Sequence, residues 1–516
     1  MAIVETRFSS PAFHRSPFDP NRRAQVKIQL KIKVMLVAEK FSRYSFVLAV
    51  ALNLHGQGRP SSDRLVKFDL ASIGARGEPV TDLESGACQV TEDGKREAFA
   101  FFHFLGNLRP ETTPPTRGEY SNRAGREAHP TIILLDLLSE RMLTWMGAGN
   151  EIVKAVEHLE SSNNLYFYVL TNHGLIYPVH PIPKNRVDFQ RDPTAQDWGK
   201  QLRIQFERLA RLFAGMRPIE DHDAVWRAQL TIRALDQFAN ELRSIPGRKN
   251  LVWISHGVPL FFPGMDGTQV DLTPQVQRLA EVMNRAGIAA YTVAQSAAGV
   301  NASIWNESRE TLRLVSDLTG GRAYPSNNAS TAITEARADL RGLYRMGYFA
   351  QRKNGDGKYH KIRVTCARKG IRLQTKMGYW DVPISGDADQ QEQTAFQAAE
   401  NSIFDDPGVG ITAVVSPLKT DLPGIRLRIR VDSTDLMPRE DYPLTFGIVE
   451  YSIDGSAQAY KAAQAAFKAA LDGWIELTRD LALDPALESI RIVVLDRGSG
   501  ETGSLTIRLA GRIEPR

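Results

Sequence analysis

The feature that most constrains the fold of this sequence is a repeated alternation of apolar runs and helical segments between residues 131 and 343. Runs without a polar break predict strands that are buried on both faces. Four of them are Thr131–Asp136, Leu165–Leu170, Leu251–Ser255 and Ile288–Val293. Repeated strand–helix alternation predicts the α/β fold class: a doubly wound, mainly parallel and Rossmann-like sheet with helices on both faces.

The segments between these runs carry the helical period. Asp223–Ser244 places apolar residues at spacings of four, three, four and three, which is one face of a helix, and Pro246 ends it. Further helices are predicted at Ile152–Leu159, Glu307–Leu318 and Ala329–Leu340, with a short strand at Arg322–Tyr324. These helices would cover the predicted sheet.

The flanking sequence predicts small β domains. Leu65–Leu70 alternates apolar and polar residues, and Glu92–Lys95 is an Asp-Gly hairpin turn followed by the β-forming run Ala98–Phe104. Tyr344–Gln351 and Tyr359–Ala367 are predicted to pair as a hairpin through Asn354–Gly357. Beyond residue 409, short strands predict a β-sandwich, interrupted by one Ala-rich helix at Ala457–Leu471.

These patterns predict seven segments along the chain. They are a basic leader with a possible signal segment (1–60), an N-terminal β unit (61–105), a linker (106–130), the α/β domain (131–343), a β-hairpin extension (344–383), a second linker (384–408) and the C-terminal sandwich (409–516). The length of 516 residues fits several domains of ordinary size.

The distribution of charge argues against nucleic acid as a partner. The formal net charge is +5, and residues 1–34 alone carry seven Lys/Arg against two acidic residues. The rest of the chain therefore holds 57 of the 64 basic residues and 57 of the 59 acidic residues. A neutral body lacks the broad basic face that phosphate binding requires.

The N-terminal segment predicts export. Lys40 and Arg43 precede the apolar run Tyr44–Leu54, which is the pattern of a secretory signal. Met35 is then an alternative start to Met1. The run is too short to span a bilayer, so no integral membrane domain is expected, and a buried strand is the other interpretation. Without a signal at this position the protein would be cytoplasmic.

The two cysteines, Cys88 and Cys366, fall in different predicted β units. Each stands alone in a strand-like context, which favours a buried free thiol over a bridge or a nucleophile. A disulfide would form only if the protein is exported and the two units pack together.

Several short motifs, in this order, resemble bacterial proteins that carry a von Willebrand factor A (VWFA)-related domain. They include Val90–Lys95, Pro246–Ser255, Thr319–Tyr324, Tyr344–Tyr348 and Lys361–Val364. The resemblance spans residues from about 65 to 380 and implies a von Willebrand A-like α/β domain in an exported protein. The C-terminal sandwich resembles the tail domain of the same proteins.

The resemblance implies a degenerate metal site. Such domains often bind Mg²⁺ or Mn²⁺ through an Asp-x-Ser-x-Ser motif, which here is Asp136-Leu137-Leu138-Ser139-Glu140, and the later Asp falls on His256. Hard cations need oxygen ligands, and several are replaced. We therefore expect no metal or other cofactor, and no effect of Asp136→Ala on melting; the alternative is a rebuilt Mg²⁺ or Mn²⁺ site of Asp136, Ser139 and Glu140.

The function predicted from the sequence is protein–protein interaction without catalysis. No nucleophile elbow, phosphate-binding loop or dinucleotide motif occurs. Ligands of open α/β sheets bind beyond the carboxyl ends of the strands, so an unknown protein partner is expected there. The predicted rim comprises Asp136, Ser139, Glu140, Thr171, Asn172, Ser255, His256, Phe261 and Phe262. The alternative is a metal-ion-dependent adhesion module.

Overall fold

The computed structural model divides the chain into two units, Met1–Gly58 and Arg59–Arg516. The residues that the structure describes all lie in the second unit: 64–106, 118–123, 129–138, 142–157, 164–184, 202–208, 224–263, 269–295, 302–325, 328–351, 355–382, 388–418, 423–452, 456–484 and 487–509. The predicted leader and signal, and the candidate residues Ser139 and Glu140, lie outside them.

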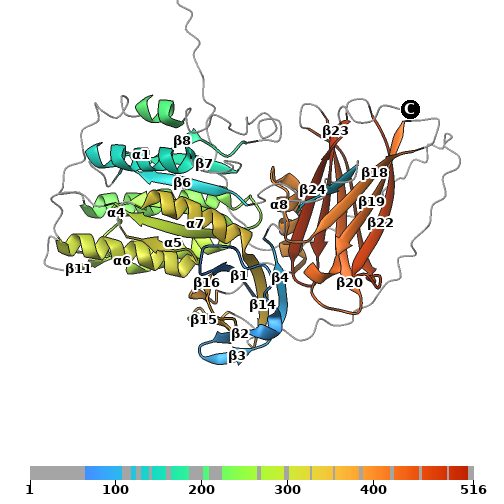
Figure 1. Ribbon diagram of the computed structural model, residues 1–516, viewed down its shortest axis with the longest axis horizontal. Coiled ribbons are helices and arrows are strands. Elements are labelled where there is room, and N and C mark those ends of the chain that lie inside the picture. Colours follow the sequence, from blue (N-terminus) through green and yellow to red (C-terminus); the bar gives the residue numbers. More distant parts are fainter. Residues whose placement is uncertain are drawn as a thin grey trace, which may run out of the picture. The chain divides into compact units, whose positions relative to one another are not determined.

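One six-stranded sheet carries the strands that the alternation predicted (Figure 1). Its order is β13 (Ala323–Tyr324), β12 (Ile288–Ala294), β9 (Lys249–Ser255), β6 (Thr131–Asp136), β7 (Leu165–Leu170) and β8 (Ile176–His180). Neighbours from β13 to β7 are parallel, whereas β8 pairs with β7 in the antiparallel sense. The sheet is therefore mixed.

Helices cover both faces of this mixed sheet. Ile133 and Leu135 of β6 pack with α1 (Met142–Glu157) and α7 (Ala329–Arg341). Ile132 and Leu134 pack with α4 (Ala224–Leu242), α5 (Thr273–Arg285) and α6 (Ala302–Thr319). Successive side chains of a strand point to opposite faces, so β6 contributes to both cores, as its unbroken apolar run predicts.

The N-terminal strands and the strands after α7 form two sheets together. The first has the order β16 (Ile371–Thr375), β1 (Arg64–Gly74), β14 (Leu343–Ala350) and β4 (Phe99–Phe104). The second has the order β17 (Gly378–Trp380), β15 (Tyr359–Cys366), β2 (Cys88–Glu92) and β3 (Lys95–Glu97). The predicted hairpin of residues 344–351 with 359–367 is wrong, because β14 and β15 pair with earlier strands and not with each other.

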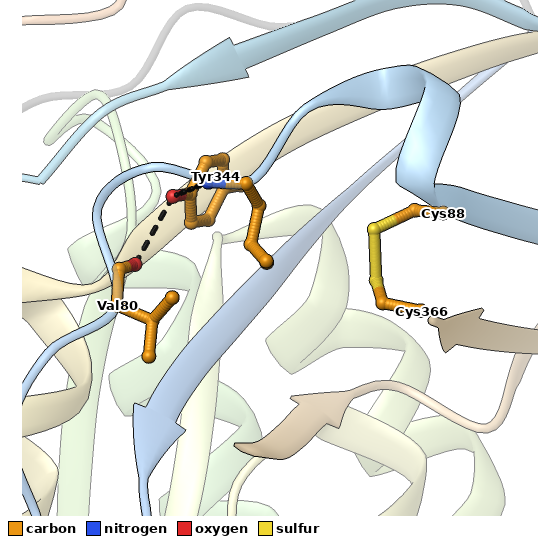
Figure 2. The surroundings of a disulfide bond; sticks show 5 residues. Val80, Cys88, Tyr344 and Cys366 are labelled. Carbon is orange, nitrogen blue, oxygen red and sulfur yellow. Dashed lines mark hydrogen bonds between the residues drawn. A yellow bond between two sulfur atoms is a disulfide. The ribbon is translucent and has the colours of Figure 1, made fainter. Parts of the chain in front are cut away.

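A disulfide joins these two stretches of chain. Cys88 and Cys366 face each other in the register of β2 and β15 and form the bond shown in Figure 2. Beside it, the hydroxyl of Tyr344 donates to the carbonyl of Val80 at 3.0 Å and accepts from the amide of Leu83 at 2.9 Å. The prediction of free thiols is wrong because strands from the two predicted β units pair with each other in the same two sheets, which sequence spacing does not reveal.

The C-terminal region contains two four-stranded antiparallel sheets around one core. Their orders are β22 (Trp474–Ala482), β19 (Gly424–Asp432), β18 (Ile411–Pro417), β5 (Glu119–Ser121), and β21 (Ala457–Phe467), β20 (Tyr442–Ser452), β23 (Leu487–Asp496), β24 (Glu501–Arg508). The predicted helix at Ala457–Leu471 is wrong: this segment is the edge strand β21. Backbone pairing with β20 along its length overrides the helix preference of alanine.

Both predicted linkers contain ordered structure. Residues 119–121 form β5, which pairs with β18 of the C-terminal region. Residues 388–401 form α8 (Ala388–Asn401), whose Phe396 and Ala399 pack on Val493 and Leu495 of β23. Phe404 follows α8 and contributes to the core on the α4 face of the mixed sheet. Polar composition concealed these contacts because each segment buries few apolar side chains.

The predicted fold class, a doubly wound von Willebrand A-like and Rossmann-like α/β chain, is wrong. Of the six sheets in the described ranges, five consist only of antiparallel pairs, and the sixth is mixed. Strand–helix alternation covers one part of the chain, and the strands on either side of it pair with distant partners. No helix in the described part of the chain is long and apolar enough to cross a membrane.

Buried charges connect β14 with the C-terminal region. The guanidinium of Arg345 donates to Asp69 Oδ1 of β1 at 2.9 Å and to Glu501 Oε2 of β24 at 2.6 Å. Lys67 Nζ lies 2.6 Å from the other oxygen of Glu501. Burial alone would raise the pKa of Glu501, but Arg345 and Lys67 outweigh it and lower this pKa to about 2. Both carboxylates therefore remain charged at neutral pH.

We expect Leu134→Ala to lower the free energy of unfolding by about 2–5 kcal/mol, since Leu134 is fully buried and its loss leaves a cavity. Urea unfolding measures this change. Leu175→Ala, at a residue that is 69% exposed, should cost less than about 0.5 kcal/mol. Equal effects of the two variants would show that Leu134 does not lie in the core.

His129 should make the protein acid-sensitive. It is buried, neither ring nitrogen has a hydrogen-bond partner among the described residues, and burial together with Arg345 lowers its pKa to about 3. The unfolded chain binds a proton near pH 6.5 and the folded chain does not, so stability falls as pH drops below 6.5.

Urea unfolding at pH 7 and pH 5 tests this expectation. Between these values His129 should account for a loss of about 2 kcal/mol, and His129→Leu should remove that part of the loss. The exposed His173 offers the matched control, His173→Leu, which should retain the wild-type pH dependence. An unchanged dependence in His129→Leu would contradict the assignment.

Candidate binding site at the carboxyl ends of the strands

The residues of the predicted rim come from the carboxyl ends of β6, β7 and β9. Asp136 ends β6 and Ser255 ends β9, while Thr171 and Asn172 begin the turn after β7. His256 follows Ser255, and Phe261 and Phe262 lie in β10 (Phe261–Pro263). Parallel strands bring their carboxyl ends to one edge of the sheet, which explains this gathering.

Asp136 is fully buried and serves the local backbone. Its Oδ1 accepts the amide of Leu138 at 3.0 Å, and its Oδ2 accepts the hydroxyl of Ser255 at 2.7 Å. The same hydroxyl oxygen accepts the amide of Gly257 at 2.9 Å. Asp136 and Ser255 therefore hold the loops after β6 and β9 in place.

His256 is turned toward the neighbouring strand. Its Nδ1 lies 2.6 Å from the carbonyl oxygen of Gln295, the residue after β12. Burial lowers the pKa of His256, opposed by this carbonyl, so the ring is neutral at pH 7. Gly257 has φ 80°, and a Cβ there would lie 2.4 Å from the carbonyl oxygen of Ser308. Only glycine fits the close approach of this loop to α6.

Thr171 shapes the turn between β7 and β8. Its amide donates to the carbonyl of Leu175 at 2.9 Å, and its hydroxyl accepts the amide of Leu175 at 3.2 Å. The turn rests on α4, because a Cβ at Gly174 would lie 2.3 Å from Cγ of Leu230. Thr171 therefore fixes the turn, and Leu175 at its end is left 69% exposed.

The hairpin of β10 and β11 (Gln269–Asp271) separates the two predicted phenylalanines. Phe262 is 6% exposed and packs with Val225 and Ala228 of α4, whereas Phe261 is 40% exposed. Alternation along a strand places them on opposite faces. Phe262 is local core, and Phe261 alone of the pair is available to a partner.

Four large exposed apolar side chains stand on α4 or on segments next to residues that pack on α4. We call Leu175, Tyr177, Trp226 and Phe261 the α4 rim; their exposed fractions are 69%, 49%, 45% and 40%. Trp226 lies one turn before Leu230, and the turn before Leu175 packs on Leu230. Trp226 is also next in sequence to Val225, which packs with Phe262.

Sequence reasoning missed three members of the α4 rim. Leu175 and Tyr177 stand in and beside a turn, where nothing in the local pattern shows that they remain exposed. Trp226 did carry a signal. It lies off the apolar face that Ala228, Ile232 and Leu235 define, and a large aromatic outside the buried stripe of a helix marks a candidate contact.

A second group of metal-ligating residues lies in the β2–β15 sheet. Ligand atoms of Glu92, Asp93 and His360, and of Asp356, His360 and Asp381, lie within 4.8 Å of one another. His360 Nδ1 is 2.7 Å from Asp93 Oδ2, and its Nε2 is 3.1 Å from Asp356 Oδ1. Asp381 pairs with Arg64. The group is accounted for as a charged and hydrogen-bonded network that holds the turns beside β15.

Comparisons with known proteins add little at this point. No family model matches the chain, and no curated protein matches it. Among solved structures, the chain matches the pilus adhesin SpaC from Lactobacillus rhamnosus GG at 10% identity and a TM-score of 0.24, covering 73% of this chain and 53% of that adhesin. A likeness at this level supports no statement about fold or function. Membership of the VWFA-related family stays a prediction.

Asp136→Ala should lower the free energy of unfolding by about 1–3 kcal/mol, because the buried donors of Leu138 and Ser255 lose their acceptor. This replaces the expectation from sequence that melting would not change. Asp472→Ala, at an exposed carboxylate, is the control and should stay within about 0.5 kcal/mol. Urea unfolding distinguishes them, and equal stability of both variants would contradict the structural role of Asp136.

Proposed function

We propose that this is an exported, non-catalytic protein that binds another protein through the α4 rim. The observation that carries the proposal is the exposure of four large apolar side chains on α4 and the loops beside it: Leu175, Tyr177, Trp226 and Phe261. Large apolar and aromatic side chains supply most of the binding energy of protein interfaces, with Trp and Tyr enriched among them.

The surroundings of the rim support binding rather than chemistry. Asp136 and Ser255 are buried and bonded to each other, and His256 is directed at the Gln295 carbonyl. These groups stabilise the loops on which the exposed residues stand. Interaction sites benefit from such rigid supports because less freedom is lost on binding. The sequence lacks the common catalytic motifs at the same loops.

The disulfide supports export. Such bonds persist in secreted and periplasmic proteins and are rare where thiols are kept reduced. Cys88 and Cys366 are separated by 278 positions, so their bond closes the chain around the mixed sheet. This observation is independent of the Lys40–Leu54 pattern on which the sequence prediction rested.

Photo-crosslinking tests the proposed surface. A benzophenone amino acid at position 261 of the full chain should crosslink one protein of the native envelope fraction, which mass spectrometry identifies. The same group at position 471, where Leu471 is also fully exposed, is the matched control and should not. Trp226→Ser in the crosslinker variant should weaken capture at least tenfold, equivalent to a loss of about 1.4 kcal/mol.

Identical products from positions 261 and 471 would contradict partner binding by the α4 rim. Capture that Trp226→Ser leaves unchanged would contradict it as well. Adding EDTA to the same experiment addresses the metal-dependent alternative. We expect capture to be unchanged, and loss of capture restored by Mg²⁺ would favour the adhesion module with a rebuilt site.

A further inference from the structure

A cationic cavity lies at the opposite edge of the mixed sheet, at the amino ends of β9 and β12. Its volume is about 320 Å³. It is lined by the turns after α4 and α5, by strands β1 and β14, by the loop after β16, and by Glu501 of β24. Seven Lys/Arg and two carboxylates line it, so its walls carry an excess of positive charge.

The two carboxylates of this cavity are already neutralised. Asp69 and Glu501 share the guanidinium of Arg345, and Lys67 pairs with Glu501 at 2.6 Å. Of the five remaining cations, Arg285 pairs with Glu281 on its own helix. Four cations, Arg243, Arg248, Lys249 and Lys376, have no carboxylate within 4 Å among the described residues.

Lys249 and Lys376 retain donors for a ligand. The ammonium of Lys249 is buried and donates to the carbonyls of Ile245 at 2.6 Å and Gly247 at 2.8 Å. Lys376 Nζ makes one hydrogen bond, at 3.4 Å to the carbonyl oxygen of Lys67, and lies 5.8 Å from the centre of the Tyr379 ring. Because an ammonium has three donors, one N–H of Lys249 and two of Lys376 remain without an acceptor in the described structure.

Cations without a paired carboxylate lower the stability of the fold when they lie in a partly buried cavity. A buried charge loses its hydration and is normally compensated by an opposite charge. Carbonyls at the ends of α4 and α5 offset part of the cost for Arg243 and Arg285, since helix C-termini favour cations. They do not supply the counter-charge of a carboxylate to Lys376, which lies in the loop after β16.

We propose that this cavity binds a small oxyanion, a molecule bearing phosphate or carboxylate groups, held by Lys249 and Lys376. Its volume lies at the lower end of the range for small-molecule sites. The ligand would complete the charge balance and accept the unused N–H groups. It would also contact residues from β1, β9 and the loop after β16 together, so binding would stabilise the packing of these elements.

The titration of the two lysines agrees with this assignment. Burial and the nearby Arg345 lower the pKa of Lys249 to about 7, against the opposing charges of Asp406 and Asp69. Burial lowers the pKa of Lys376 to about 8, opposed by Asp69. The other charged groups around them are Lys67, Arg243, Arg248, Arg285, Glu501 and the neutral His129. An anion favours the charged form of each lysine, so binding should be tighter at pH 6 than at pH 9.

The test uses the purified full chain and two probes, inorganic phosphate and citrate, at an ionic strength held constant with NaCl. Isothermal titration calorimetry at pH 6 should give saturable binding, and the melting temperature should rise with probe concentration because only the folded state binds. Lys376→Gln, at a partly buried loop residue, should weaken binding at least tenfold. Lys468→Gln, a single charge removed from a side chain that is 73% exposed, should stay within twofold.

Each outcome decides the proposal. Weakening in Lys376→Gln alone, and weaker binding by wild type at pH 9, support it, and preference for phosphate or for citrate names the ligand group. Lys249→Gln adds a second measurement, with circular dichroism confirming that the variant folds. Two results would overturn the proposal: no saturable heat with either probe, or equal melting shifts in wild type, Lys376→Gln and Lys468→Gln. The cations would then only interact with the carbonyls at the helix C-termini.

Discussion

The pairing of β1 with β14 is the interaction on which the rest of this structure depends. Eight residue pairs, from Arg64↔Ala350 to Ala71↔Leu343, join the start of the described chain to the strand after α7. This pairing closes the intervening chain, including the mixed sheet and its helices, into a loop with both ends held together. The disulfide between β2 and β15 closes the same loop covalently one layer away. Closing a long loop costs chain entropy once, and every contact within the closed segment then forms at lower cost.

The two edges of the mixed sheet differ in the polarity and charge of the side chains that lie beside them. At the carboxyl ends of the strands, Asp136 and Ser255 satisfy each other and the loop amides, and the exposed residues there include Leu175 and Phe261. At the amino ends, β1 and β14 bring Lys67 and Arg345 against Lys249, which adds cations to an edge where helices already end. One edge therefore suits a protein surface, whereas the other suits a small anion. The difference arises from which residues lie beside each edge and from the helix C-termini that lie at the amino edge.

Local patterns in the sequence predicted individual elements well, and failed where pairing is distant. Thr131–Asp136 was recognised as a doubly buried strand because its apolar run has no break, and the alternation in Leu65–Leu70 located β1. No local sequence pattern shows that β1 pairs with β14 rather than with a neighbouring strand. This one cause explains why the predicted hairpin, the free thiols and the doubly wound fold class were all wrong. At the candidate site, Asp136 and Ser255 end β6 and β9 at the expected edge, but their contacts join loops that are distant in sequence, and partner binding by this edge stays a prediction. Ala457–Phe467 failed for a different reason, because its helix preference lost to pairing with β20.

The charge pairing of Arg345 contrasts with that of the other cations at the amino edge of the mixed sheet. A buried ion pair rarely stabilises a fold more than apolar residues of the same volume would, because each charge loses its hydration. Arg345 nevertheless engages Asp69 and Glu501 together and joins β1, β14 and β24 at one point. Removing either acid would take away one of the two carboxylates that compensate the guanidinium, so charge as well as packing holds the three strands in one arrangement. Lys249 and Lys376 stand beside this network without an acid of their own, and burial has brought their pKa values close to neutrality. Resident carboxylates thus compensate the charge of Arg345 but not those of Lys249 and Lys376 in the same cavity, which is the arrangement expected where the missing charge belongs to a ligand.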